Sequence, residues 1–218
     1  MIDAVILLLC DFVMVENKRY AVPAETCRVE DEIKRSRFIT TLAYTPTEDE
    51  ARAFINQMRT EFADASHNCW AYLIGPPGNT GIVGMSDDGE PHGTAGRPML
   101  TVLSHCELGD ITAVVTRYYG GTNLGKGGLV RAYSGGVQHA LEAVPRGEHI
   151  LYVTAMIVID YPTIESFKRK LPDFEAEITA EEFGADVTFE IKIPEEHMAT
   201  FTDAITELTN GRAQIEIM

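Results

Sequence analysis

The chain of 218 residues has few cysteines, little positive charge and no long apolar run. Its four cysteines, Cys10, Cys27, Cys69 and Cys106, are scattered, and no two of them form a C-x-x-C pair. This spacing indicates neither a disulfide framework nor a zinc site, and it is typical of a protein in the reducing cytosol. We therefore expect a cytoplasmic protein without a metal or another cofactor.

The amino-terminal segment contains the apolar run Val5–Leu9, which lies between Asp3 and Asp11. A secretory signal has a positive start and an apolar core of about 7–15 residues, and a membrane span needs about 20. The run satisfies neither requirement, so we expect no membrane contact. Because Met14 begins an ordinary-looking start, residues 1–13 are predicted to be either an addition ahead of it or a docking strand.

Positive charge is scarce, with 18 lysines and arginines against 33 aspartates and glutamates. The net charge of −15 argues against a general polyanion binder. Residues 1–149 hold 13 of the basic and 19 of the acidic residues, a net −6, and residues 150–218 hold the other 5 and 14, a net −9. Any contact with nucleic acid must therefore be a local patch on the first part, and we expect no sequence-specific recognition of DNA.

Residues 117–133 are the most informative part of the chain, because five glycines lie between a strand-like run and a helix-like run. Glycine lets another backbone or a ligand come close, and the start of a helix carries unpaired N–H groups that attract anions. Three cations surround the turn, and each is expected at or near solvent: Arg117, Lys126 and Arg131. Because Arg117 ends a strand, its alternative is a structural ion pair with Asp87 or Glu90. The pattern favours contact with a phosphate backbone or an acidic partner.

Two other interpretations of the glycine turn are open. The stretch Gly120–Lys126 matches the G-x-x-x-x-G-K of a phosphate loop, but Gly127 follows where that motif needs a hydroxyl for Mg²⁺. The plainer interpretation is a tight turn that packs a helix against a sheet.

A second loop, residues 85–98, is rich in acids and glycines. The carboxylates of Asp87, Asp88 and Glu90 could hold a divalent ion, and His92 could move protons, although the spacing does not match a calcium loop. The plainer interpretation is a turn followed by a helix that Thr94 caps. If the two glycine-rich loops meet in the fold, His92 and Arg97 would flank the cationic patch.

Periodicity predicts an α+β protein of two domains, residues 19–146 and 148–218, which divide near Pro145–Gly147. Thr47 and Glu50 form the capping box of a first helix. The second part has the order βαββαβ, which is the ferredoxin-like split unit. Its predicted elements are strand 150–160, helix 163–171, strands 175–183 and 186–193, helix 195–208 and strand 213–217.

Several short motifs resemble the Impact family. The matching segments are 22–24, 32–39, 86–91, 93–98 and 117–121. The resemblance covers about residues 20–141, and the remainder is similar to a smaller carboxy-terminal domain of bacterial members. It implies a first domain with the fold shared by a small-subunit ribosomal protein and the fourth domain of elongation factor G. It also implies a ferredoxin-like second domain, similar to the fifth domain of that factor.

The resemblance implies a non-enzymatic binding protein linked to translation or its regulation, because the eukaryotic relatives act in translational control by binding proteins. We expect it to contact RNA or a ribosome-associated partner. Tyr118 and Tyr119 could stack on bases, and strand alternation predicts that one of them faces the core. The predicted contact residues are Arg117, Tyr118, Gly120, Gly121, Gly125, Lys126, Gly127, Gly128, Arg131, Arg97 and His92.

Two alternative functions stay open. One is a small-molecule enzyme with a phosphate- or peptide-type substrate, which would use Asp87, Asp88, Glu90 and His92 as acid–base or metal groups. The other is a purely structural module that assembles through the acidic second domain. A contiguous positive groove would favour the binding protein, whereas converging carboxylates in a deep pocket would favour the enzyme.

Overall fold

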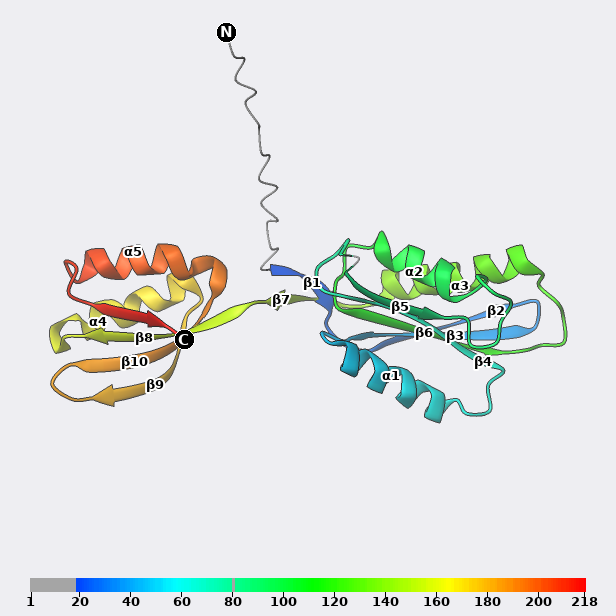
Figure 1. Cartoon of the computed structure of the whole chain (residues 1–218), viewed down its shortest axis with the longest axis horizontal. Helices are drawn as coiled ribbons and strands as arrows, with labels where there is room; N and C mark the ends of the chain where they lie inside the picture. The colour runs from blue at the N-terminus through cyan, green and yellow to red at the C-terminus, as the bar shows by residue number, and fades with distance from the viewer. Residues whose placement is uncertain (1–18, 80) are drawn as a thin grey trace, which may run out of the picture.

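The computed structural model describes residues 19–79 and 81–218, which form two units of helices and strands joined by a ribbon (Figure 1). The ribbon consists of β1 (Arg19–Pro23) and β7 (Arg146–Ile150), which pair in antiparallel register. The α+β class is confirmed, because each unit has its own sheet with helices packed on it. The dividing point near Pro145–Gly147 lies where β7 begins.

The first unit is built on a five-stranded sheet in the order β2-β3-β6-β4-β5, with every neighbouring pair antiparallel. Its strands are β2 (Cys27–Ile33), β3 (Ser36–Tyr44), β4 (His67–Ile74), β5 (Ile82–Ser86) and β6 (Ile111–Tyr118). The central strand β6 is buried along almost its whole length, and its buried residues include Thr112, Thr116 and Arg117 besides the apolar ones.

Helices cover both faces of this sheet (Figure 1). One face carries α1 (Glu48–Glu61), and the other carries α2 (Gly96–Ser104) and α3 (Lys126–Ala143). The predicted Thr47 cap is confirmed, because its hydroxyl accepts a hydrogen bond from the Glu50 N–H at 3.2 Å. The Glu50 carboxylate accepts from the Thr47 hydroxyl at 3.1 Å, which differs from the reciprocal bond to the backbone in a full capping box.

The second unit has a four-stranded antiparallel sheet in the order β11-β8-β10-β9. The predicted succession of strands and helices is confirmed, and Phe167, Phe189 and Phe201 pack together in its core. Its elements are β8 (Tyr152–Ile159), α4 (Ile164–Lys170), β9 (Glu177–Phe183), β10 (Val187–Pro194), α5 (Met198–Leu208) and β11 (Gln214–Ile217).

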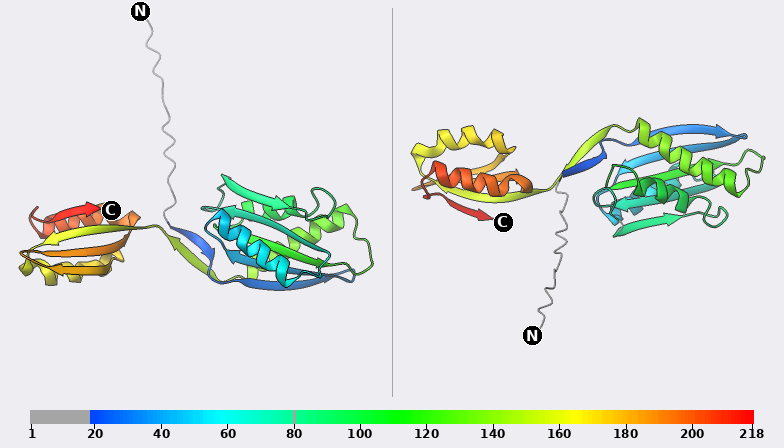
Figure 2. Two further views of the ribbon diagram at one scale, coloured as in Figure 1. Left: turned by 60° about the horizontal axis from the view of Figure 1, so that its bottom comes forward. Right: turned by 90° about the horizontal axis from the view of Figure 1, so that it is seen from above.

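The two units have separate hydrophobic cores, and the ribbon connects them (Figure 2). Arg19 of β1 contacts Glu148 of β7 at 3.2 Å and, in the second unit, Glu175 and Glu196 at 2.8 Å each. No helix in residues 19–79 and 81–218 is long and apolar enough to cross a membrane. The prediction for residues 1–13 lies outside the described part of the chain.

Candidate functional site

The two glycine-rich loops meet at one end of the first sheet. Strand register places Ile33 opposite Ser36, Arg37 opposite Tyr118, and His67 opposite Arg117. The β2–β3 turn, the end of β6 and the start of β4 therefore lie at the same end of the sheet. The loop after β5 and the starts of α2 and α3 lie there as well, and in Figure 1 this end points away from the second unit.

A buried ion pair ties the two loops together. The guanidinium of Arg117 donates to the Glu90 carboxylate at 2.6 Å, and the side chains are only 6% and 3% exposed. The hydroxyl of Tyr133, from α3, donates to the same carboxylate oxygen at 2.7 Å. The expectation that Arg117 lies at or near solvent is therefore wrong, and its alternative, an ion pair with Glu90, is confirmed.

Asp87 serves as the cap of α2. Its carboxylate accepts hydrogen bonds from the backbone N–H groups of Gly93 (2.8 Å), Ala95 (3.0 Å) and Gly96 (2.9 Å). Burial raises the pKa of Asp87, but these donors outweigh it and hold the pKa below its usual range. The predicted Thr94 cap is wrong, since the Thr94 hydroxyl donates to the Pro91 carbonyl instead.

Asp88 is also engaged within the protein. One carboxylate oxygen accepts the backbone N–H of Asn68 at 2.7 Å, and the other pairs with Arg59 at 2.8 Å. The three acids of the loop thus point to three different partners instead of converging. In the described part of the chain, no three His, Cys, Asp or Glu side chains gather so that they could hold a metal ion.

Gly120 has to be glycine for steric reasons. A Cβ atom there would lie 1.8 Å from the carbonyl oxygen of Arg35, so the glycine loop presses directly on the β2–β3 turn. The Gly120 N–H donates to the Ser36 hydroxyl at 3.2 Å, which also accepts from Arg117 at 3.4 Å. The turn and the loop are therefore held as one surface.

The start of α3 is open. Its first residue follows Gly125, which has a φ of 71° and contributes no side-chain cap, and the first turn contains no acidic residue. A Cβ at Gly127 would meet nothing within 4 Å, and Lys126 is exposed. Among the described side chains, none accepts the first N–H groups of α3, so they face outward with the positive end of the helix dipole.

The lysines and arginines of the first unit fall into two groups, those that form ion pairs with acids and those that do not. Within residues 19–79 and 81–150, seven arginines form ion pairs with acids: Arg19, Arg28, Arg37, Arg52, Arg59, Arg117 and Arg146. Five exposed cations in the same ranges have no such partner: Lys34, Arg35, Arg97, Lys126 and Arg131. These five, which we call the cationic end, come from the β2–β3 turn and from the starts of α2 and α3.

Lys34 and Arg35 were missed as site residues. They form the two-residue turn between β2 and β3, with φ values of 47° and 66°. A turn of this kind favours Asn-Gly, because both residues need positive φ. Two cations between two predicted strands, at positions where Gly or Asn is expected, were the signal that could have identified them.

The remaining predicted residues are distributed around this end. His92 is fully exposed, 3.6 Å from Asp87, and it lines a hollow of about 490 Å³ together with Arg97. The hydroxyl of Tyr118 donates to Asp64 at 2.7 Å. The prediction that one of the two tyrosines faces the core is wrong: Tyr118 is half-buried, and Tyr119 lies beyond the end of β6 and is 54% exposed.

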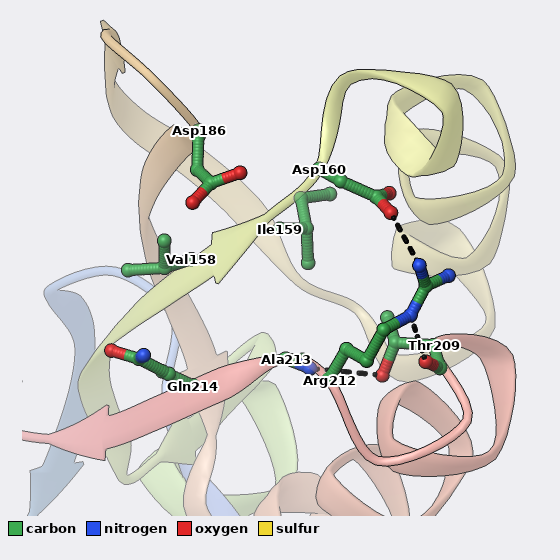
Figure 3. A pocket seen from close by; sticks show the side chains of 8 residues that line it. All are labelled: Val158, Ile159, Asp160, Asp186, Thr209, Arg212, Ala213 and Gln214. Carbon is green, nitrogen blue, oxygen red and sulfur yellow. Dashed lines mark hydrogen bonds and ion pairs between the residues drawn. The ribbon is translucent and has the colours of Figure 1, made fainter.

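The second unit has a hollow of its own, of about 290 Å³, that contains none of the predicted residues (Figure 3). Arg212 crosses one side of it, paired with Asp160 at 3.1 Å, and its Nε donates to the Thr209 carbonyl at 3.1 Å. Asp186 lies on the other side. The hollow is polar, with an arginine that already has an acidic partner.

Comparison with known proteins gives two domain matches and full-length relatives. Residues 34–141 match the Impact N-terminal domain, and residues 157–212 match a domain of unknown function, DUF1949. An IMPACT family member of Haemophilus influenzae is 40% identical over 199 residues, which cover 91% of this chain and 97% of that protein. The chain belongs to the IMPACT family.

Two further similar proteins cover the chain to a similar extent. YigZ of Escherichia coli is 38% identical over 90% of this chain and 96% of its own length. A crystal structure of a protein described only as hypothetical is 38% identical, with a TM-score of 0.66 over 91% of this chain and 96% of that one. The Impact N-terminal match begins at Lys34, so all five cations of the cationic end fall within it.

Proposed function

We propose that this IMPACT family member is a non-enzymatic, cytoplasmic protein linked to translation, which binds RNA through the cationic end of its first unit. We also propose the two domains 19–146 and 148–218, the first with the ribosomal-protein-like fold. The strand order β11-β8-β10-β9 supports a ferredoxin-like fold for the second domain.

The observation that carries the proposal is the grouping of unpaired cations in an acidic protein. Elsewhere in the described first unit, each basic residue has a carboxylate partner. Two of the acids near the cationic end are paired, Glu30 with Arg37 and Asp88 with Arg59, whereas the exposed Glu32 has no ion-pair partner among the described residues. The unpaired cations outnumber the unpaired acids at this end, which favours contact with a phosphate backbone.

The backbone strain in the β2–β3 turn is a second observation that supports the proposed binding function. Positive φ costs a non-glycine residue about 1–2 kcal/mol, yet Lys34 and Arg35 both adopt it. Such strain is typical of positions kept for function, because the fold alone would favour Asn-Gly there. The open start of α3 adds outward N–H groups beside Lys126, which can donate hydrogen bonds to a phosphate oxygen.

The test is binding of an unstructured 12-nucleotide RNA, measured by fluorescence anisotropy at several salt concentrations. We expect a log–log salt slope on the order of −3 for the wild-type chain, since each single-strand phosphate contact contributes about −0.7. The variant Lys126→Ala/Arg131→Ala should lose affinity and reduce the slope by about 1.4.

The matched control is Arg169→Ala/Lys170→Ala, which removes two exposed cations from α4 of the second unit. It changes the net charge equally and should leave RNA binding almost unchanged. Equal affinity in both double variants contradicts the proposal. Loss of binding to a ribosome-associated protein in the first variant, with RNA binding intact, would assign the cationic end to a protein partner instead.

The contacts of the loop acids argue against the enzyme alternative, although Asp87 and His92 line a hollow of about 490 Å³. Asp87 caps α2, Asp88 holds β4 and α1, and Glu90 is buried with Arg117 and Tyr133. Of the four residues named for acid–base work, only His92 faces solvent freely.

A further inference from the structure

The last two residues before the glycine loop are both tyrosines, but they differ in what holds them. Tyr118 is occupied, because its hydroxyl donates to Asp64 at 2.7 Å and the guanidinium of Arg37 lies 5.7 Å from its ring centre. Tyr119 is 54% exposed, and no hydrogen bond of its hydroxyl is found within the described residues. A large aromatic ring is thus presented to solvent at the cationic end.

Contacts with Ser66 and Arg117 hold Tyr119 in place. Its backbone N–H donates to the Ser66 hydroxyl at 3.1 Å, and the guanidinium of Arg117 lies 5.4 Å from the ring centre. Arg117 is itself fixed by Glu90, so the buried ion pair supports the exposed ring. A ring held in this way loses little conformational freedom when a ligand stacks on it.

Tyr119 also lies beside the cations of the turn. The residue that follows it, Gly120, presses on the carbonyl of Arg35, so the ring and the strained turn belong to one rigid surface. A stacking ring next to exposed positive charge is the combination that binds single-stranded nucleic acid. Duplex bases are already stacked and offer a ring no open face, whereas unpaired bases do.

From these contacts we infer that the cationic end takes a single RNA strand, one base of which stacks on Tyr119, and this inference rests on the proposed function. Phosphates on either side of that base contact the turn and the start of α3. Because every base has a flat face, recognition of this kind tolerates different sequences.

The test compares the 12-nucleotide single strand with the same RNA annealed to its complement. The variant Tyr119→Ala should bind the single strand about tenfold more weakly and the duplex as well as the wild-type chain does. Tyr119→Phe should restore single-strand binding. The matched control is Tyr152→Ala, because Tyr152 is 39% exposed and has the ammonium of Lys192 4.2 Å from its ring, but lies in the second unit.

A direct readout of stacking comes from Tyr119→Trp. We expect the added tryptophan fluorescence to be quenched by the single strand but not by the duplex or by inorganic triphosphate. Trp70 is the one tryptophan of the natural chain, and its signal is subtracted with the wild-type protein.

The outcomes separate the two proposals. If RNA binds and depends on Lys126 and Arg131 while Tyr119→Ala changes nothing, or weakens single strand and duplex equally, the stacking inference is overturned and the proposed function stands. If the wild-type chain binds neither RNA at low salt, both are overturned.

Discussion

Glu90 and Arg117 form a 2.6 Å ion pair inside the first unit, and this contact joins the two glycine-rich loops. Removing one partner leaves the other charge buried without compensation, which typically costs about 3–5 kcal/mol. We therefore predict that Glu90→Gln and Arg117→Met each lower the free energy of unfolding by about 3 kcal/mol, measured by urea denaturation.

The control for this pair is Arg59→Ala, which breaks the partly exposed contact with Asp88. It should cost less than about 1 kcal/mol, as exposed ion pairs usually do. If Arg117→Met keeps its stability but fails to bind RNA, the structural role of Arg117 is contradicted and the residue belongs to the binding surface.

The Asp87 cap should make the first unit sensitive to acid. Its pKa lies below the usual value in the folded state, so its contribution to stability is present above the unfolded pKa of about 3.9. That contribution is lost as pH falls through the folded pKa. Asp87→Ala should cost about 2 kcal/mol at pH 7, and less of that difference should remain in acid. Urea midpoints of both chains across pH 7 to 3 test this, with the exposed Asp203→Asn as control.

The β2–β3 turn should show a conflict between stability and binding. Replacing it by Lys34→Asn/Arg35→Gly relieves the positive-φ strain, which should raise stability by about 1 kcal/mol. The same change removes two cations and should weaken RNA binding severalfold. Thermal melts and anisotropy on the same sample measure both effects, and a turn that loses stability without losing affinity would contradict the expected role.

Arg19 should control how the ribbon opens. Its side chain contacts Glu148, Glu175 and Glu196, so it links β1 to β7 and to the second unit. In Arg19→Ala, trypsin should cut after Arg146 faster than in the wild-type chain, because β7 is freed more often. The comparison is made by mass spectrometry of the fragments, with Arg52→Ala as a surface control in α1. Unchanged cleavage would show that backbone pairing alone holds the ribbon.

The sequence predicts local features of this fold well, because those features depend on neighbouring residues. Thr47 and Glu50 are three positions apart, and the succession of elements in the second unit follows from periodicity and turn residues. For Arg117 the sequence left two positions open, at solvent or in an ion pair with Asp87 or Glu90, and periodicity could not decide between them. Strand β6 is buried on both faces, so it has no alternation from which the direction of a side chain can be read.

Partners far apart in the chain explain the other errors. Arg117 meets Glu90 across 27 positions, and only that contact separates a buried cation from an exposed one. The Asp87 cap, which acts on backbone N–H groups up to nine positions later, displaced the local cap expected from Thr94. A pattern of residue types indicates that a site exists, but it does not indicate which charged side chains form ion pairs inside the protein.

The cationic end points away from the second unit (Figure 1), whose residues 150–218 carry a net −9. If the cationic end binds RNA as proposed, the acidic second unit is repelled by the polyanion more strongly than the cationic end is. We therefore expect the second unit to influence the orientation in which the protein approaches RNA without contacting it.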